Sequence, residues 1–98
     1  MTDWRVEIIE QGRCGLVHYH EGSCVARFDW EFGGGKAVAI VWGPPPGSWD
    51  AVYPWAAGRR LEILQRVAQE VVRQKAPDCV AYFDPSYPQG FQIRPKNE

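Results

Sequence analysis

Two histidines separated by one residue, His18 and His20, have side chains and a spacing that suit a metal site. Alternate residues of a β-strand lie on one face of a sheet, so both imidazoles would point the same way if this segment is a strand. Cys24 follows after a short turn containing glycine and could add a thiolate from the next strand. Imidazole nitrogen and thiolate sulfur are ligands that zinc prefers. Because such loose spacing is common by chance, we predict no bound metal or other cofactor, and these three residues remain the candidate ligands.

Two acidic residues, Asp29 and Glu31, alternate with aromatic residues and would share one strand face with Arg27. Carboxylates two positions apart on a strand lie about 7 Å from each other, close enough to divide the acid and base roles of a hydrolysis. Alternating charges are also the ordinary pattern of a strand face in contact with water. The three cysteines form no Cys-x-x-Cys pair and show no pattern typical of a nucleophile. We therefore predict no catalytic residues and favour a protein without enzymatic activity.

The segment that spans residues 42–55 combines three tryptophans, one tyrosine and four prolines, and we call it the Trp-Pro segment. Each proline fixes its own φ angle and restricts the residue before it, so the segment is stiff although irregular. Aromatic rings on a stiff loop lose little entropy when they bind a partner, and they also make good covers for a hydrophobic core. The sequence leaves both uses open. The aromatic residues of this segment that we single out for binding are Trp42, Trp49, Tyr53 and Trp55.

Arg59 and Arg60 follow the Trp-Pro segment directly, in the first turns of an expected helix. Cations are unfavourable there because the N-terminus of a helix carries a partial positive charge. Arg60 could pair with Asp50, stack on Trp49 or Trp55, or bind an anionic ligand. We therefore add both arginines to the candidate binding residues.

Alternating apolar residues predict strands on both sides of a single long helix. Apolar residues at helical spacing predict a helix that begins at Pro54 or Ala56 and ends at Lys75. The glycines at positions 33–35 predict a tight reversal of the chain. The expected strands are residues 4–9, 16–20, 25–32, 37–42 and 80–83, and residues 91–93 could add a short sixth strand.

The apolar face of the helix and the aromatic face of the third strand, residues 25–32, each need a partner. They predict an α+β fold with two layers, in which one long amphipathic helix packs on one face of a mainly antiparallel sheet of four to six strands. The expected order of elements is ββββαβ. Ninety-eight residues suit a single domain, 1–98, in which we expect residues 94–98 to be a flexible tail.

The net charge of −1 argues against nucleic acid as a partner, because it provides no general attraction to phosphates. No apolar run approaches the roughly 18 residues that cross a membrane, and the N-terminus has no apolar leader. We therefore expect no membrane association and a cytoplasmic location.

The combined features predict a small stand-alone binding or interaction protein that uses the Trp-Pro segment. A protein partner or a second copy of the chain in a homodimer is the first candidate, and a small-molecule ligand is the second. The alternative is a small enzyme or ligand-binding pocket built from Arg60, Asp50, His18 and His20. That alternative requires the four side chains to converge on one cavity.

Overall fold

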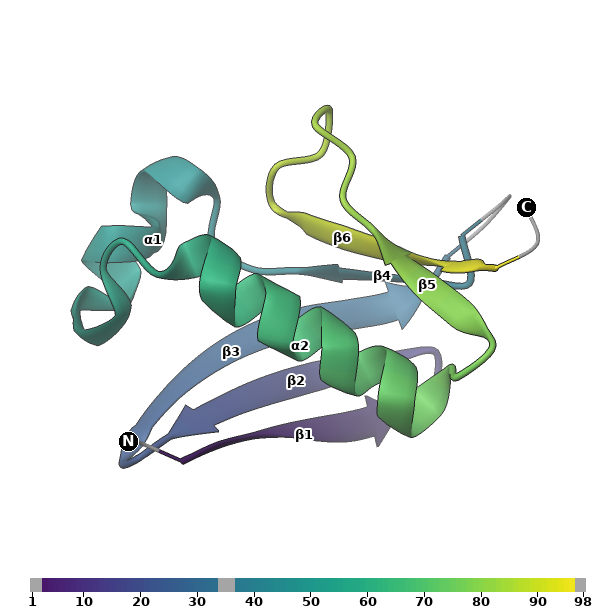
Figure 1. Cartoon of the computed structure of the whole chain (residues 1–98), viewed down its shortest axis with the longest axis horizontal. Coiled ribbons are helices and arrows are strands. Elements are labelled where there is room, and N and C mark those ends of the chain that lie inside the picture. Colours follow the sequence, from purple (N-terminus) through teal and green to yellow (C-terminus); the bar gives the residue numbers. More distant parts are fainter. Residues whose placement is uncertain (1–2, 34–36, 97–98) are drawn as a thin grey trace.

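The structure, a computed structural model, describes residues 3–33 and 37–96. These residues form one antiparallel sheet of six strands, and α2 (Arg60–Lys75) lies across one face of it (Figure 1). We call the opposite face, on which the described part of the chain places no helix, the open face. The strands are β1 (Trp4–Gln11), β2 (Cys14–Glu21), β3 (Cys24–Phe32), β4 (Ala39–Trp42), β5 (Cys79–Tyr82) and β6 (Gly90–Pro95).

The strand order in the sheet is β1-β2-β3-β4-β6-β5. The first four strands are joined in chain order, and β6 then pairs with β4, so that β5 forms the far edge. Trp42 lies opposite Gly90 in the β4–β6 pair. A Cβ atom on Gly90 would lie only 1.8 Å from the Val41 carbonyl oxygen, so this strand pair requires glycine at position 90.

The core lies between α2 and the sheet, as the alternating pattern predicted. On β3, Ala26, Phe28 and Trp30 are buried, while Arg27 and Asp29 are exposed on the open face. The helix contributes one stripe of buried residues at helical spacing. The buried helical residues are Ile63, Leu64, Val67, Ala68 and Val71.

The α+β class and the antiparallel sheet are confirmed, but the prediction of one long helix in the order ββββαβ was wrong in detail. A short helix, α1 (Pro46–Val52), and a 3₁₀ turn (Pro54–Ala56) precede α2, and two strands follow it. Gly58 separates these helical pieces because its φ of +76° is left-handed. Leu61, an apolar residue in the first turn of α2, is 59% exposed.

The C-terminal segment is more ordered than predicted, because Arg94 and Pro95 belong to β6 and pair with β5. The backbone N–H of Lys96 also donates to the Asp78 carbonyl oxygen at 3.2 Å. Residues 97–98 of the expected tail, and residues 34 and 35 of the expected glycine turn, lie outside the described residues. None of the described helices is both long and apolar enough to span a membrane.

Candidate functional site

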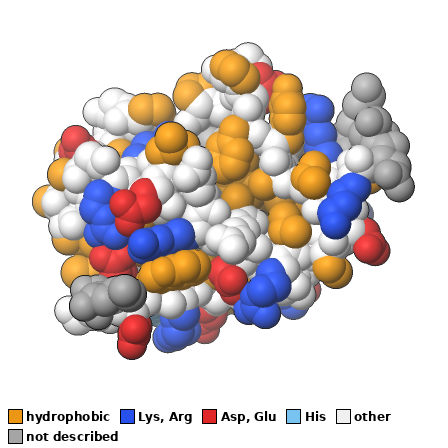
Figure 2. Space-filling model, viewed as in Figure 1, with side chains coloured by type: hydrophobic (Ala, Val, Ile, Leu, Met, Phe, Trp, Pro, Cys, Tyr) orange, Lys and Arg blue, Asp and Glu red, His pale blue; other side chains and the backbone are white. Residues whose placement is uncertain are grey.

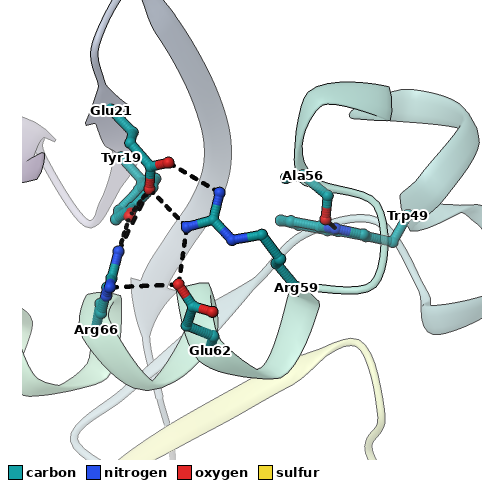
Figure 3. A network of polar contacts seen from close by, with 7 residues as sticks. All are labelled: Tyr19, Glu21, Trp49, Ala56, Arg59, Glu62 and Arg66. Carbon is teal, nitrogen blue, oxygen red and sulfur yellow. Dashed lines mark hydrogen bonds and ion pairs between the residues drawn. The ribbon is translucent and has the colours of Figure 1, made fainter. Parts of the chain in front are cut away.

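Part of the Trp-Pro segment covers the core. Trp49 is 1% exposed, and its indole Nε1 donates a hydrogen bond to the Ala56 carbonyl oxygen at 2.9 Å (Figure 3). Its ring stacks on Phe28 and meets Tyr53 edge-on. This is one of the two uses that the sequence left open, since a loop between a sheet and a helix lies where a small core needs closing.

Tyr53 is held against the edge of β3. Its hydroxyl accepts a hydrogen bond from the Arg27 backbone N–H at 2.8 Å and donates one to the Arg27 carbonyl oxygen at 3.2 Å. Trp55 is half-buried against the core and meets the Tyr53 ring edge-on. These contacts give both rings a structural role.

Arg59 belongs to a network of charges above the N-terminal half of α2 (Figure 3). It forms a two-pronged ion pair with Glu21, at 2.8 Å for each hydrogen bond, and contacts Glu62 at 2.7 Å. Arg66 contacts both carboxylates at 3.3 Å. Glu21 also accepts a hydrogen bond from the buried Tyr19 hydroxyl at 2.5 Å. The hydrogen bonds from Arg59 are the main reason that the pKa of Glu21 falls to about 2.

Arg60 joins two loops instead of binding Asp50 or a tryptophan. Its guanidinium donates to the Pro44 carbonyl oxygen at 3.4 Å and to the Pro88 carbonyl oxygen. Burial lowers the pKa of Arg60. Asp50 instead accepts a hydrogen bond from the Gly58 backbone N–H at 3.0 Å. The positive charge that looked unfavourable at the helix start therefore fixes the Trp-Pro segment to the loop before β6.

The four residues of the alternative pocket, Arg60, Asp50, His18 and His20, do not converge on one cavity. His18 and His20 lie on the open face of β2, while Arg60 begins α2 on the other side of the sheet. Trp42 is also on the open face, in a shallow depression of about 170 Å³ that it shares with Glu31 and Tyr87. The candidate residues are therefore distributed over both faces.

Glu7 joins the two histidines on the open face, in the place that the sequence suggested for Cys24. Glu7 lies opposite His18 in the β1–β2 pair, and its Oε1 lies 3.1 Å from His20 Nε2 and 3.7 Å from His18 Nδ1. The hydrogen bond with His20 lowers the pKa of Glu7. Cys24 lies opposite Glu21, and strand alternation places it on the helix side with Ala26. The sequence did contain a signal that Glu7 would lie beside the histidines. The tight turn after Gln11 sets the register of the first hairpin and so determines which residues of β1 and β2 lie opposite each other.

An apolar cavity of about 250 Å³ lies between the C-terminal end of α2 and the sheet, and the sequence did not predict it. Ten of its twelve lining residues are apolar. The two polar residues, Glu10 and Lys75, form an ion pair at 2.6 Å. The other lining residues include the buried Val17, Trp30, Val41, Val71 and Ile93 and the exposed Phe32 and Val38.

The helix side of the surface divides into a charged part and an apolar part. Figure 2 shows acidic and basic side chains next to each other over the N-terminal half of α2. It also shows apolar side chains gathered between α2 and the β5–β6 pair. Phe83, which follows β5 in the chain, is 38% exposed and packs on the buried Phe91 of β6.

Comparisons with known proteins identify no relative. The chain matches no protein-family model, no curated protein and no solved structure. The site must therefore be interpreted from its own geometry.

Proposed function

We propose that this chain is a small binding protein whose ligand is a small, mostly apolar molecule held in the cavity at the C-terminal end of α2. The observation that carries the proposal is the cavity itself, about 250 Å³ in volume and lined by ten apolar residues. The class of protein is the one expected from the sequence. The proposed site is the cavity and not the Trp-Pro segment, because Trp49 and Tyr53 are already engaged in packing and hydrogen bonding.

The size of the cavity indicates the size of the ligand. Protein interiors are normally close-packed, and an apolar cavity of about 150 Å³ can bind benzene. A cavity of about 250 Å³ therefore suits a molecule of about ten non-hydrogen atoms. Contact with Val71 on the helix and with Val41 and Ile93 on the sheet would remove most of its surface from water.

The polar residues of the cavity indicate what the ligand carries at one end. Glu10 and Lys75 are 58% and 46% exposed in their side chains, and they neutralise each other in an ion pair. An exposed pair of this kind contributes little stability, so it can rearrange around a ligand. Because the pair presents both signs of charge, it favours an uncharged polar end, such as a hydroxyl group, over a charged one.

Filling the cavity tests the proposal. Ala39 faces the cavity from β4, and Ala39→Leu would occupy part of its volume. The probe is 2-phenylethanol, and its binding is measured by the rise in melting temperature and by titration calorimetry. We expect the wild-type chain to bind the probe and Ala39→Leu to bind it at least about tenfold more weakly, which is about 1.4 kcal/mol.

The matched control is Ala51→Leu, which makes the same change at an exposed position of α1 outside the cavity. This variant should bind the probe as the wild type does. The proposal fails if the wild-type chain binds no small apolar alcohol, or if Ala39→Leu folds and binds the probe unchanged.

A further inference from the structure

Three side chains with metal-binding atoms meet on the open face, on the opposite side of the sheet from the cavity proposed above. Glu7, His18 and His20 each offer one ligand atom, and these three atoms all lie within 4.8 Å of one another. Zinc binds its ligands at about 2.1 Å, so a tetrahedral site holds neighbouring ligand atoms about 3.4 Å apart. The Glu7 oxygen already lies 3.1 Å from His20 Nε2 and 3.7 Å from His18 Nδ1, which brackets that spacing.

The hydrogen bonding of His18 is incomplete. Its Nε2 atom is buried and finds no hydrogen-bond partner among the described residues. Its Nδ1 atom is too far from Glu7 for a good hydrogen bond. The Nδ1 atom is the nitrogen that faces Glu7, so it is the one available to a metal, and a metal there would leave Nε2 unpaired.

The position of the cluster on two paired strands makes it rigid. Glu7 and His18 are directly opposite each other in the β1–β2 ladder, and His20 is two residues along the same face. The histidine side chains are 20% and 22% exposed, so little side-chain freedom remains to be lost on binding a metal.

An open depression of about 350 Å³ borders the cluster at His20. Arg5, which lies opposite His20, also lines it, as does Asp3. A second arginine, Arg27, lies opposite His18 on the other neighbouring strand. These positive charges would attract an anion to the free positions of a bound metal.

We propose that Glu7, His18 and His20 form a zinc site with three protein ligands. Two imidazoles and one carboxylate are a ligand set that suits zinc and is poor for calcium or magnesium, which prefer oxygen. A fourth position remains open towards the depression that Arg5 lines. A small anion, such as phosphate or a carboxylate, would bind there by contacting both the metal and Arg5.

The first experiment measures Zn²⁺ binding to the full chain by titration calorimetry after treatment with a chelator. We expect one Zn²⁺ per chain and a higher melting temperature in its presence, since binding to the folded state stabilises that state. His18→Gln and His20→Gln should each weaken Zn²⁺ binding by at least about 100-fold. Losing a residue that only supports a metal ligand costs up to about 100-fold in affinity, and losing a ligand itself should cost at least as much. Co²⁺ in place of Zn²⁺ adds an absorption spectrum that reports the coordination geometry.

Two control variants locate the site. Cys24→Ser removes the nearby thiol on the other side of the sheet, and Asp29→Asn removes an open-face carboxylate outside the cluster. Both should bind Zn²⁺ with wild-type affinity. The variants in the cluster change side chains that are 20% and 22% exposed, so circular dichroism verifies that each variant folds. The proposal is overturned if the wild-type chain shows no saturable Zn²⁺ binding, or if folded His18→Gln and His20→Gln variants keep their affinity.

Discussion

Glu21 should contribute to stability in a way that depends on pH, and Glu21→Gln tests this. The carboxylate receives hydrogen bonds from Arg59 and Tyr19 and contacts Arg66, and its side chain is only 12% exposed. Glutamine keeps the shape of the side chain and removes the charge. The substitution therefore leaves the guanidinium groups of Arg59 and Arg66 with one of their two shared carboxylates, Glu62.

The size of the expected loss of stability follows from the pKa of Glu21. Arg59, above all, lowers the pKa of Glu21 from 4.5 to about 2, and a change of this size corresponds to at most about 3 kcal/mol at neutral pH. Arg59 and Arg66 are 31% and 30% exposed, so water and salt weaken the interaction. We therefore expect Glu21→Gln to lower the free energy of unfolding by about 1 to 2 kcal/mol at pH 7.

The sign of the pKa shift of Glu21 determines how its contribution to stability changes with pH. A lowered pKa in the folded state means that the contribution of Glu21 is complete above pH 4.5 and is lost as the pH falls towards 2. The difference between the wild type and Glu21→Gln should therefore be constant from pH 7 to about 5 and should shrink to near zero by about pH 2.

The assay is urea denaturation followed by tryptophan fluorescence at several pH values. Glu62→Gln is the control, because Glu62 contacts the same two arginines but is 44% exposed. This variant should lose clearly less unfolding free energy than Glu21→Gln. Equal stability of the wild type and Glu21→Gln at pH 7 would refute the reasoning. A difference that stays unchanged down to pH 2 would also refute it, because the cause would then be packing and not charge.

Two further predictions concern the core and the sheet. Trp49→Phe removes the hydrogen bond to Ala56 and part of a buried ring, so we expect a loss of about 2 kcal/mol in urea denaturation; an unchanged midpoint would show that Trp49 does not close the core. Gly90→Ala forces a Cβ atom against the Val41 carbonyl and should cost about 3 kcal/mol or more, measured in the same way. Gly47→Ala, where an added Cβ meets nothing within 4 Å, should be neutral or stabilising, and an equal loss in both variants would contradict this explanation.

The fold was largely predictable because alternation on the strands is strong. Phe28 and Trp30 had to face the same side of β3, and the helix was the one expected element with a matching apolar surface. The break at Gly58 was harder to foresee, because a helical pattern continues across it in the sequence.

The site was less predictable because it depends on residues far apart in the chain. Glu21 and Arg59 are separated by 38 positions, and their pairing follows from how α2 crosses β2. Glu7 meets His18 only when the register of the first hairpin is known. The cavity near Val71 reflects how completely side-chain volumes fill the space between helix and sheet, and residue types alone do not reveal this.

The hydroxyl of Tyr53 has a consequence for how this protein behaves when it is concentrated. β3 extends beyond the end of β4, and in the described structure residues 24–28 have no neighbouring strand on that side. An uncovered strand edge is a template for aggregation. Because Tyr53 occupies both the N–H and the carbonyl of Arg27, an incoming chain would have to displace its ring before it could add a strand there. Through one phenol group, the Trp-Pro segment thus covers part of an open strand edge as well as closing the core.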